Sequence, residues 1–391
     1  MRGLGAADRP VGLAPERRLG APAALAIAAG ASTVLPGFLV GALTLQVRGD
    51  LGVSVGAVAA GVTVFFAAGA VSAGIGGRFA ERIGAVRAIR GCLLVTAATL
   101  ALAGLLSQSL PVFLGFLAIA GVSNAITQPA INLFMADQVP LDRQGLAFGI
   151  KQSAIPAAIL ISGLALPALA LPFGWRPTFV ICALLPLTVF AVVRRAAPGL
   201  AEPPERPPPP RPSRKLVITA IAAALASSGP GALSAYLVAS AVDVGIAEGV
   251  AGVLAALGSA TSLVVRVLVG ERADRRRDYG FSTMVALLVA GAVGFALLAV
   301  GEAASFVVGA FVVFALGWGW PGLFNLAVVD LHRESPGAAT GISQMGIYVG
   351  AAVGPGAYGL LSSRVGYPAA WGVAAGVSLL AAAAIAYAAA R

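Results

Sequence analysis

The residue in this chain with the clearest capacity to bind a charged molecule is Lys151. It lies within a long apolar run, 145–171, and Gln152 follows it directly. A helix rises about 1.5 Å per residue, which places this lysine ~10 Å from the end of the run. An ammonium group at that depth can bind a carboxylate or a similar anion. Alternatively, its aliphatic stem carries the charge back to the polar end of the helix.

Uncharged polar residues mark two other apolar runs. Asn124 and Gln128 are four residues apart in the run 111–137, so they share one face of a helix. They either contact a bound molecule or form hydrogen bonds between helices, and both interpretations stay open. Trp318, in the run 303–330, provides either an aromatic wall for that molecule or ordinary packing.

Arg266 lies near the end of the apolar run 248–269, four residues before Gly270. It is either a second ligand for an anion or a member of the basic cluster that follows the run. We favour the basic cluster, because the residue lies so close to it.

The sequence predicts no catalytic site, no metal site and no cofactor. His332 is the only histidine, and Cys92 and Cys182 lie in separate apolar runs without the spacing of metal ligands or of a disulfide framework. No aspartate or glutamate lies in the middle of an apolar run, which argues against a deep proton relay. We therefore expect that the protein is not an enzyme.

The composition predicts a protein whose solvent is a lipid bilayer. The chain is 59% hydrophobic and 11% charged, which is too few charges for the surface of a soluble protein of 391 residues. The net charge of +10 would suit nucleic acid, but the arginines form short clusters between apolar runs instead of a basic groove. We expect no nucleic-acid partner.

Twelve apolar runs are long enough to cross a hydrocarbon core as helices, which takes about 20 residues. They do not alternate polar and apolar residues, as a membrane β-barrel would require. The predicted fold is an all-α membrane protein with twelve transmembrane helices in two pseudo-symmetric six-helix bundles. The runs cover residues 22–47, 53–75, 88–106, 111–137, 145–171, 177–193, 216–242, 248–269, 281–300, 303–330, 338–363 and 367–389.

Basic residues are distributed unevenly between the two ends of these helices. If the N-terminus is cytoplasmic, only Arg48, Arg176 and Arg364 fall outside, and the other 23 of the 26 lysines and arginines fall inside. This bias predicts that both termini are cytoplasmic. Arginine far outnumbers lysine, and alanine and glycine dominate the composition, which favours a bacterial inner membrane.

Four short motifs occur twice, 192 to 194 positions apart and in the same order. No pair is convincing alone, but the nearly constant offset indicates a duplicated unit, with a binding site between two similar halves. Ser343-Gln344 repeats Lys151-Gln152, so Gln344 is a further candidate ligand. The paired motifs begin at Pro36 and Pro230, Gly77 and Gly270, Asn132 and Asn325, and Gly149 and Gly341.

A proline-rich segment between the sixth and seventh runs divides the chain in two. It contains four consecutive prolines, 207–210, and is expected to be an extended cytoplasmic linker. The predicted domains are a cytoplasmic tail at 1–21, a six-helix bundle at 22–193, the linker at 194–215 and a second six-helix bundle at 216–391.

A Pro-Gly step lies in the first helix of each half, at Pro36-Gly37 and Pro230-Gly231. Proline removes a backbone hydrogen bond and glycine adds flexibility, so these steps are expected to interrupt the helices as a bending gate would require. A static kink is the alternative.

Residues 77–87 carry the most specific motif of the chain. They read Gly-Arg-Phe-Ala-Glu-Arg-Ile-Gly-Ala-Val-Arg and lie between the second and third runs. Together with the twelve runs and the central linker, they resemble the major facilitator superfamily, whose signature loop reads Gly-x-x-x-Asp-Arg-x-Gly-x-x-Arg. Glu81 stands in place of the aspartate. The resemblance covers the whole chain in architecture and about ten residues in strong motif.

The resemblance implies that this loop latches the cytoplasmic ends of the two halves in the outward-open state. Gly77 and Gly84 would permit its tight turn, and Glu81 would accept hydrogen bonds from an arginine or a helix N-terminus. Acidic residues at the ends of equivalent helices would pair with the loop arginines. The predicted latch residues are Gly77, Glu81, Arg82, Gly84, Arg87, Gly270, Asp274, Arg275, Asp137 and Asp330.

Two patterns of the family's proton-driven exporters are displaced or missing. Leu117 occupies the place in the fourth span where such proteins often have arginine. The Gly-x-x-x-Gly-Pro pattern, usual in the fifth span, occurs here at 350–355 in the eleventh. Both departures weaken the interpretation as a proton-driven drug exporter.

The sequence therefore predicts a secondary active or facilitative transporter that works by alternating access. Lys151 makes a small organic anion the first choice of substrate, with or without a coupling ion. The alternative is efflux of amphipathic, drug-like compounds. We expect a monomer in the lipid bilayer. The predicted substrate ligands are Lys151, Gln152, Asn124, Gln128, Trp318 and Gln344.

Overall fold

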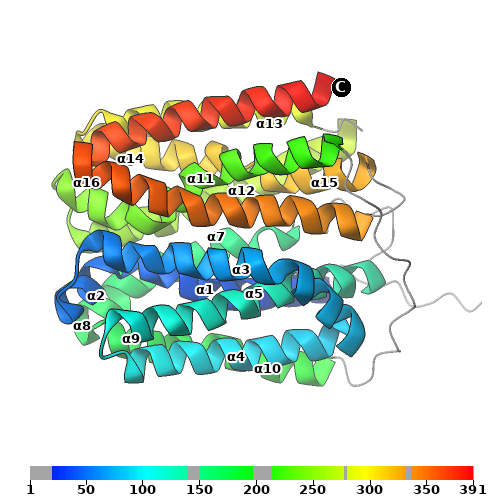
Figure 1. Cartoon of the computed structure of the whole chain (residues 1–391), viewed down its shortest axis with the longest axis horizontal. Helices are drawn as coiled ribbons and strands as arrows, with labels where there is room; N and C mark the ends of the chain where they lie inside the picture. The colour runs from blue at the N-terminus through cyan, green and yellow to red at the C-terminus, as the bar shows by residue number, and fades with distance from the viewer. Residues whose placement is uncertain (1–19, 139–149, 197–213, 277–279, 332–335, 391) are drawn as a thin grey trace, which may run out of the picture.

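The computed structural model describes residues 20–138, 150–196, 214–276, 280–331 and 336–390. In these segments the chain is almost entirely helical and contains no strand. The helices run along one long axis, and Figure 1 shows the blue to cyan helices below the yellow to red ones. We call residues 20–196 the first helix group and residues 214–390 the second helix group.

The first helix group forms the spans that precede the linker. Short irregular steps divide some of its long helices, and one of them includes a π-helical segment, η2. Its elements are α1 (Gly20–Ala42), α2 (Thr44–Leu51), α3 (Val55–Ile83), α4 (Ala85–Leu106), α5 (Leu110–Gln138), α7 (Ala154–Ala165), η2 (Leu166–Ala170), α8 (Leu171–Phe173), α9 (Trp175–Cys182) and α10 (Leu184–Ala196).

The second helix group has a similar organisation, with a second π-helical segment, η3, in its fourth span. Its elements are α11 (Arg214–Asp243), α12 (Glu248–Arg276), α13 (Phe281–Ala299), α14 (Ala303–Val312), η3 (Val313–Gly317), α15 (Pro321–Leu331) and α16 (Pro336–Ala390).

The number of membrane crossings follows from the apolar stretches. Eleven helical stretches of the described chain are long and apolar enough to cross a bilayer, and the last of them, within α16, has 49 residues. Gly366 interrupts α16 with a φ of +82°, which glycine adopts without steric cost, and the chain folds back there. Because α16 makes two crossings, the predicted all-α fold with twelve transmembrane helices is confirmed.

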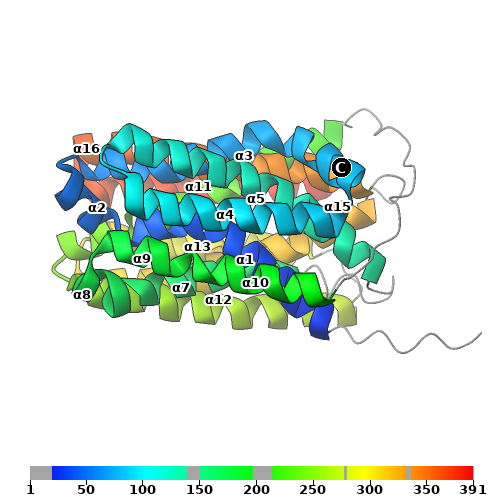
Figure 2. The same ribbon diagram turned by 90° about the horizontal axis from the view of Figure 1, so that it is seen from below.

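The two ends of the bundle differ. At one end, which we call the linker end, α1 begins and α10 ends, and both lie on the right of Figure 2. At the opposite end, which we call the turn end, tight turns join consecutive helices. Five of these turns contain a glycine with positive φ, namely Gly52, Gly174, Gly245, Gly301 and Gly366.

Apolar packing joins the two helix groups from the middle of the bundle to the turn end. One continuous core there contains Trp175 of the first group and Tyr236 of the second. Toward the linker end, each group packs around a core of its own, which contains Phe134 in the first group and Phe324 in the second. The described structure is therefore closed at the turn end, and the groups share no core at the linker end.

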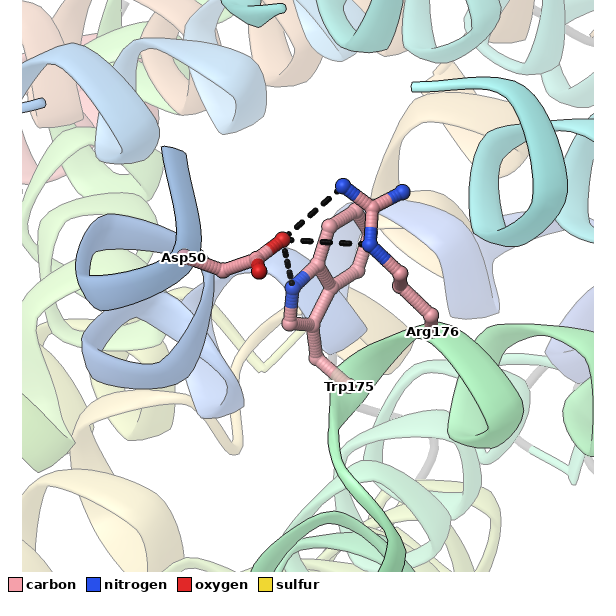
Figure 3. Close-up of polar contacts among 3 residues, drawn as sticks. All are labelled: Asp50, Trp175 and Arg176. Atoms are coloured by element: carbon pink, nitrogen blue, oxygen red, sulfur yellow. Dashed lines mark hydrogen bonds and ion pairs between the residues drawn. The ribbon is translucent and has the colours of Figure 1, made fainter. Parts of the chain in front are cut away.

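Polar contacts hold α2 on both sides at the turn end (Figure 3). The Asp50 carboxylate accepts hydrogen bonds from Trp175 Nε1 at 3.1 Å and from Nε and Nη2 of Arg176 at 3.1 and 2.9 Å. Both charged side chains are partly exposed, so this ion pair contributes roughly 1 kcal/mol or less. On the same helix, Gln46 donates a hydrogen bond to Glu248 of α12, which connects α2 to the second group.

The glycines of the eleventh span pack against backbone. A β-carbon on Gly350 of α16 would lie 2.0 Å from the carbonyl oxygen of Ala224 in α11. Gly346 and Gly354 face α11 in the same way. Their β-carbons would lie 2.2 and 2.0 Å from the carbonyl oxygens of the residues one helical turn before and after Ala224. Because the three glycines are four residues apart, α11 and α16 meet along one stripe of small residues.

Gly350→Val is therefore expected to destabilise the protein by about 1–3 kcal/mol, the usual cost of overpacking. The measurement is the thermal unfolding midpoint of detergent-purified protein, followed by tryptophan fluorescence. Gly376→Val is the matched control on α16, because nothing lies within 4 Å of the β-carbon position of Gly376. Equal midpoints for the two variants would contradict this description of the packing.

Candidate functional site

A small cavity of about 40 Å³ lies between the two helix groups, in the middle of the bundle, and we call it the central cavity. Helices α1, α3, α5 and α7 contribute to its wall from the first group, and α11, α15 and α16 contribute from the second. Its polar lining consists of Asn124, Gln128, Gln152, Ser227, Ser234, Gln344 and Tyr348, and the other aromatic residues are Phe38, Phe66 and Trp318.

The central cavity brings together five of the six predicted substrate ligands, namely Asn124, Gln128, Gln152, Trp318 and Gln344. Trp320, two residues after Trp318, instead packs edge-to-face against Phe324 in the core of the second group. Contact of the five residues with a substrate stays a prediction.

Asn124 forms hydrogen bonds between helices as well as lining the cavity. Its Oδ1 accepts from Thr33 Oγ1 and from Gln128 Nε2, and its Nδ2 donates to the hydroxyl of Tyr348, all at 3.3 Å. The bond to Tyr348 connects the first helix group to the second. These distances are longer than the usual ~2.9 Å, so a bound ligand could replace such bonds at low cost.

Ser227 adds an unused hydroxyl to the wall. The residue is 5% exposed, and its Oγ has no hydrogen-bond partner among the described residues. A buried polar atom that lines a cavity usually bonds to water or to a ligand. This face of α11 could have been predicted from the sequence. The spacing around the second Pro-Gly step places on one helical face the residues Ser227, Gly231 and Ser234.

Lys151 is buried, at 3% exposed, but does not itself line the central cavity. The helix α7 begins only at Ala154, and Lys151 lies three residues before it, next to a turn in which Ser153 N–H donates to the carbonyl of Ile150 at 3.0 Å. This burial disagrees with the interpretation in which the charge returns to the polar end of the helix. No ion-pair partner of its ammonium group lies in the described part of the chain.

Arg266 was placed wrongly by the sequence analysis. It does not join the basic cluster after the eighth span, because α12 continues to Arg276 and the Arg266 side chain is only 3% exposed. Its Nε and Nη2 donate to the carbonyl of Trp318 at 3.1 and 2.8 Å, and its Nη1 donates to the carbonyl of Gln152. The guanidinium therefore joins the two helix groups through two residues that line the central cavity.

Both carbonyls can accept these bonds because the helices are interrupted beside them. Gln152 lies in the turn that precedes α7, and Trp318 lies in the irregular step between η3 and α15. A backbone carbonyl without a helical partner needs another donor when it is buried. The charged guanidinium supplies such a donor to each interruption.

Lys151 and Arg266 share one further property. They are the only buried charged side chains in the described residues, which contain no buried aspartate or glutamate. The positive charge beside the central cavity therefore has no buried acidic partner within that part of the chain.

The predicted latch residues lie at the linker end. Glu81 and Arg82 are exposed near the end of α3, and Arg87 is exposed in the first turn of α4. Gly84, with a φ of +89°, forms the turn between these helices. Gly77 lies inside α3, so the prediction that it contributes to the turn is wrong. Gly270 lies inside α12, and the side chains of Asp137, Asp274, Arg275 and Asp330 lie outside the described residues.

Neither Pro-Gly step interrupts its helix, contrary to the prediction. α1 runs through Pro36-Gly37 and α11 runs through Pro230-Gly231, and the first span is interrupted at Leu43, between α1 and α2. The glycines instead allow close packing, against the ring of Phe65 and the backbone of Ala351 respectively. A role of these steps in gating stays a prediction.

Comparison with known proteins places this architecture in a family. No curated protein matches the chain. The family model described as Major Facilitator Superfamily matches residues 23–341, well over half of the chain. Members of that family carry small molecules across membranes and are not enzymes. The match, the twelve crossings and the cavity between two helix groups agree, and the chain belongs to the Major Facilitator Superfamily, as a multi-pass membrane transporter.

Proposed function

We propose that this transporter moves a small organic anion by alternating access, with the two helix groups turning about the central cavity. The observation that carries the proposal is the sign of the buried charges. Lys151 and Arg266 are both cationic, and no buried acid accompanies them in the described residues. A buried cation is costly unless an anion pairs with it, so an anionic substrate would be stabilised in the central cavity.

The wall of the cavity supplies the other interactions that an organic anion needs. The amide groups of Gln128, Gln152 and Gln344 can donate hydrogen bonds to carboxylate oxygens. The rings of Phe38 and Phe66 can pack against a carbon skeleton. A volume of about 40 Å³ holds only a few water molecules, so the helix groups must part before a substrate enters.

We further infer that the linker end faces the cytoplasm of a bacterial cell and that the protein acts as a monomer. Of the three outer arginines of the sequence analysis, Arg48 and Arg364 are exposed and Arg176 is partly exposed, all at the turn end, in agreement with this orientation. Glu81 and Arg82, at the linker end, are in the right region to latch the two groups when that end closes.

Efflux of amphipathic, drug-like compounds is the second candidate. The observation that favours it is the aromatic share of the cavity wall, which includes Phe38, Phe66, Trp318 and Tyr348. Such rings bind apolar or cationic groups without selecting for negative charge.

The test is a thermal-shift screen of the detergent-purified protein against acetate, lactate, succinate, amino acids, sugars and lipophilic cationic dyes. A ligand that binds only the folded state stabilises it by about 2.7 kcal/mol at 100 times its dissociation constant, and this raises the melting temperature. We expect a carboxylate to stabilise the protein and Lys151→Gln to lose that stabilisation, because the variant removes one of the two buried charges.

Lys215→Gln is the matched control, since Lys215 is the only other lysine and lies at the start of α11. It should keep the full response to the carboxylate. Stabilisation by lipophilic cations alone, unchanged in Lys151→Gln, would reject the anion proposal in favour of efflux.

A further inference from the structure

A second cavity, of about 20 Å³, lies between the same helix groups, and we call it the turn-side cavity. On α1, which runs toward the turn end, the central cavity begins at Val34 and the turn-side cavity extends to Ala42. On α11, which runs in the same direction, the corresponding residues are Ser227 and Val238. The turn-side cavity is therefore displaced from the central cavity toward the turn end.

Two residues line both cavities, Phe38 and Ser234, and only Phe38 is large enough to separate them. The Phe38 ring packs edge-to-face on Phe66 of the first group and on Trp318 of the second, with centroids 6.2 and 6.1 Å apart. Phe38 itself is 3% exposed. Its ring therefore stands at the boundary and contacts both helix groups.

At the turn-side cavity, the groups touch through glycines. A β-carbon on Gly41 would lie 1.8 Å from the carbonyl oxygen of Ser234, and one on Gly163 would lie 2.5 Å from that of Gly252. Both glycines line the turn-side cavity. These two contacts bring backbone against backbone, and Phe38 remains the only bulky side chain that lines both cavities.

We propose that Phe38 is the gate between the central cavity and the turn end, and that the turn-side cavity is the next part of the same transport path. In the described conformation the ring closes the central cavity against the turn end, braced by Phe66 and Trp318. When the groups part, the ring loses its contact with Trp318 and can rotate. This inference goes beyond the proposed function, because it holds for any substrate that uses the path.

The test measures how fast single cysteines react with sulfonatoethyl methanethiosulfonate, a reagent that does not cross membranes, added on the turn-end side. The background carries Cys92→Ala and Cys182→Ala, which remove the two native cysteines. Ser227→Cys reports on the central cavity alone and Ser162→Cys on the turn-side cavity alone. Ser109→Cys, exposed at the turn end, confirms that the reagent reaches that face.

Phe38→Ala is expected to raise the reaction rate of Ser227→Cys about tenfold, because no ring then separates the central cavity from the turn-side cavity, and to change that of Ser162→Cys less than about twofold. Phe38→Tyr keeps the ring and should leave both rates near those of the parent. Phe66→Ala is the matched control, since Phe66 lines only the central cavity. It removes one brace but leaves the Phe38 ring in place, so it should raise the Ser227→Cys rate by no more than about threefold.

Gel filtration and the rate of Ser109→Cys verify that each variant is folded. If Phe38→Ala does not fold, Phe38→Leu replaces it, and an increase of about threefold at Ser227→Cys is expected from the smaller side chain. Equal increases at both reporters, or an increase with Phe66→Ala as large as with Phe38→Ala, would overturn the assignment of Phe38 as the gate.

Discussion

Arg266→Gln is expected to abolish transport and to lower the free energy of unfolding by about 2–6 kcal/mol. The substitution leaves the carbonyls of Gln152 and Trp318 without their charged donor, and a buried unsatisfied group costs about 1–3 kcal/mol. It also removes one of the two buried positive charges beside the central cavity. Uptake of the stabilising carboxylate into proteoliposomes measures the first effect, and thermal unfolding measures the second.

Two further variants separate charge from structure. Arg272→Gln removes an exposed arginine from the same helix. It should change neither the rate of transport nor the free energy of unfolding. Arg266→Lys keeps the charge but lacks the planar fork that reaches two carbonyls, so it should keep carboxylate binding while it loses part of the stability. If Arg266→Gln unfolds at a lower temperature but still transports at the normal rate, Arg266 has only a structural role.

Gly41→Val is expected to abolish transport without a large loss of stability. Its β-carbon would collide with the carbonyl oxygen of Ser234 in the other helix group, so the turn end cannot close. The groups can relieve the collision by staying apart, an escape that Gly350→Val lacks because α11 and α16 belong to the same group. The variant should therefore accumulate with its turn end open.

The distance between spin labels at Ser54→Cys and Ser305→Cys, in the cysteine-free background, reports on this opening. Ser54 is exposed and Ser305 is partly exposed, and both lie at the turn end, one in each helix group. We expect the distance distribution to shift to longer values in Gly41→Val and to stay unchanged in Gly49→Val, because nothing surrounds the β-carbon position of Gly49. An unchanged distribution in Gly41→Val would show that the contact between Gly41 and Ser234 tolerates a side chain.

The helices could be predicted from the sequence because the bilayer demands long apolar stretches, and these are visible without knowledge of contacts. Their ends could not, since an amphipathic helix continues beyond the hydrocarbon core. This is why Arg266 was assigned to the basic cluster after the eighth run: the apolar run ends at 269, whereas α12 continues to Arg276. Its partners are backbone carbonyls, which no pattern of side chains reveals.

The polar wall of the central cavity was largely predictable, since polar residues in apolar helices are costly and must face the protein interior. Phe38 and Tyr348 were missed because an aromatic residue in an apolar run looks the same whether it packs in a core or lines a path. Tyr348 follows Gln344 by one helical turn, and this spacing could have added it to the predicted face.

The glycine contacts between the two helix groups have a consequence for how the path becomes wet. A helical carbonyl oxygen keeps a free lone pair, and at Gly41 and Gly163 the opposing helix covers such oxygens without any intervening side chain. When the groups separate, water can reach these oxygens directly. Hydration along this part of the path would then come largely from the peptide backbone, so a sequence with few polar side chains here can still line an aqueous passage.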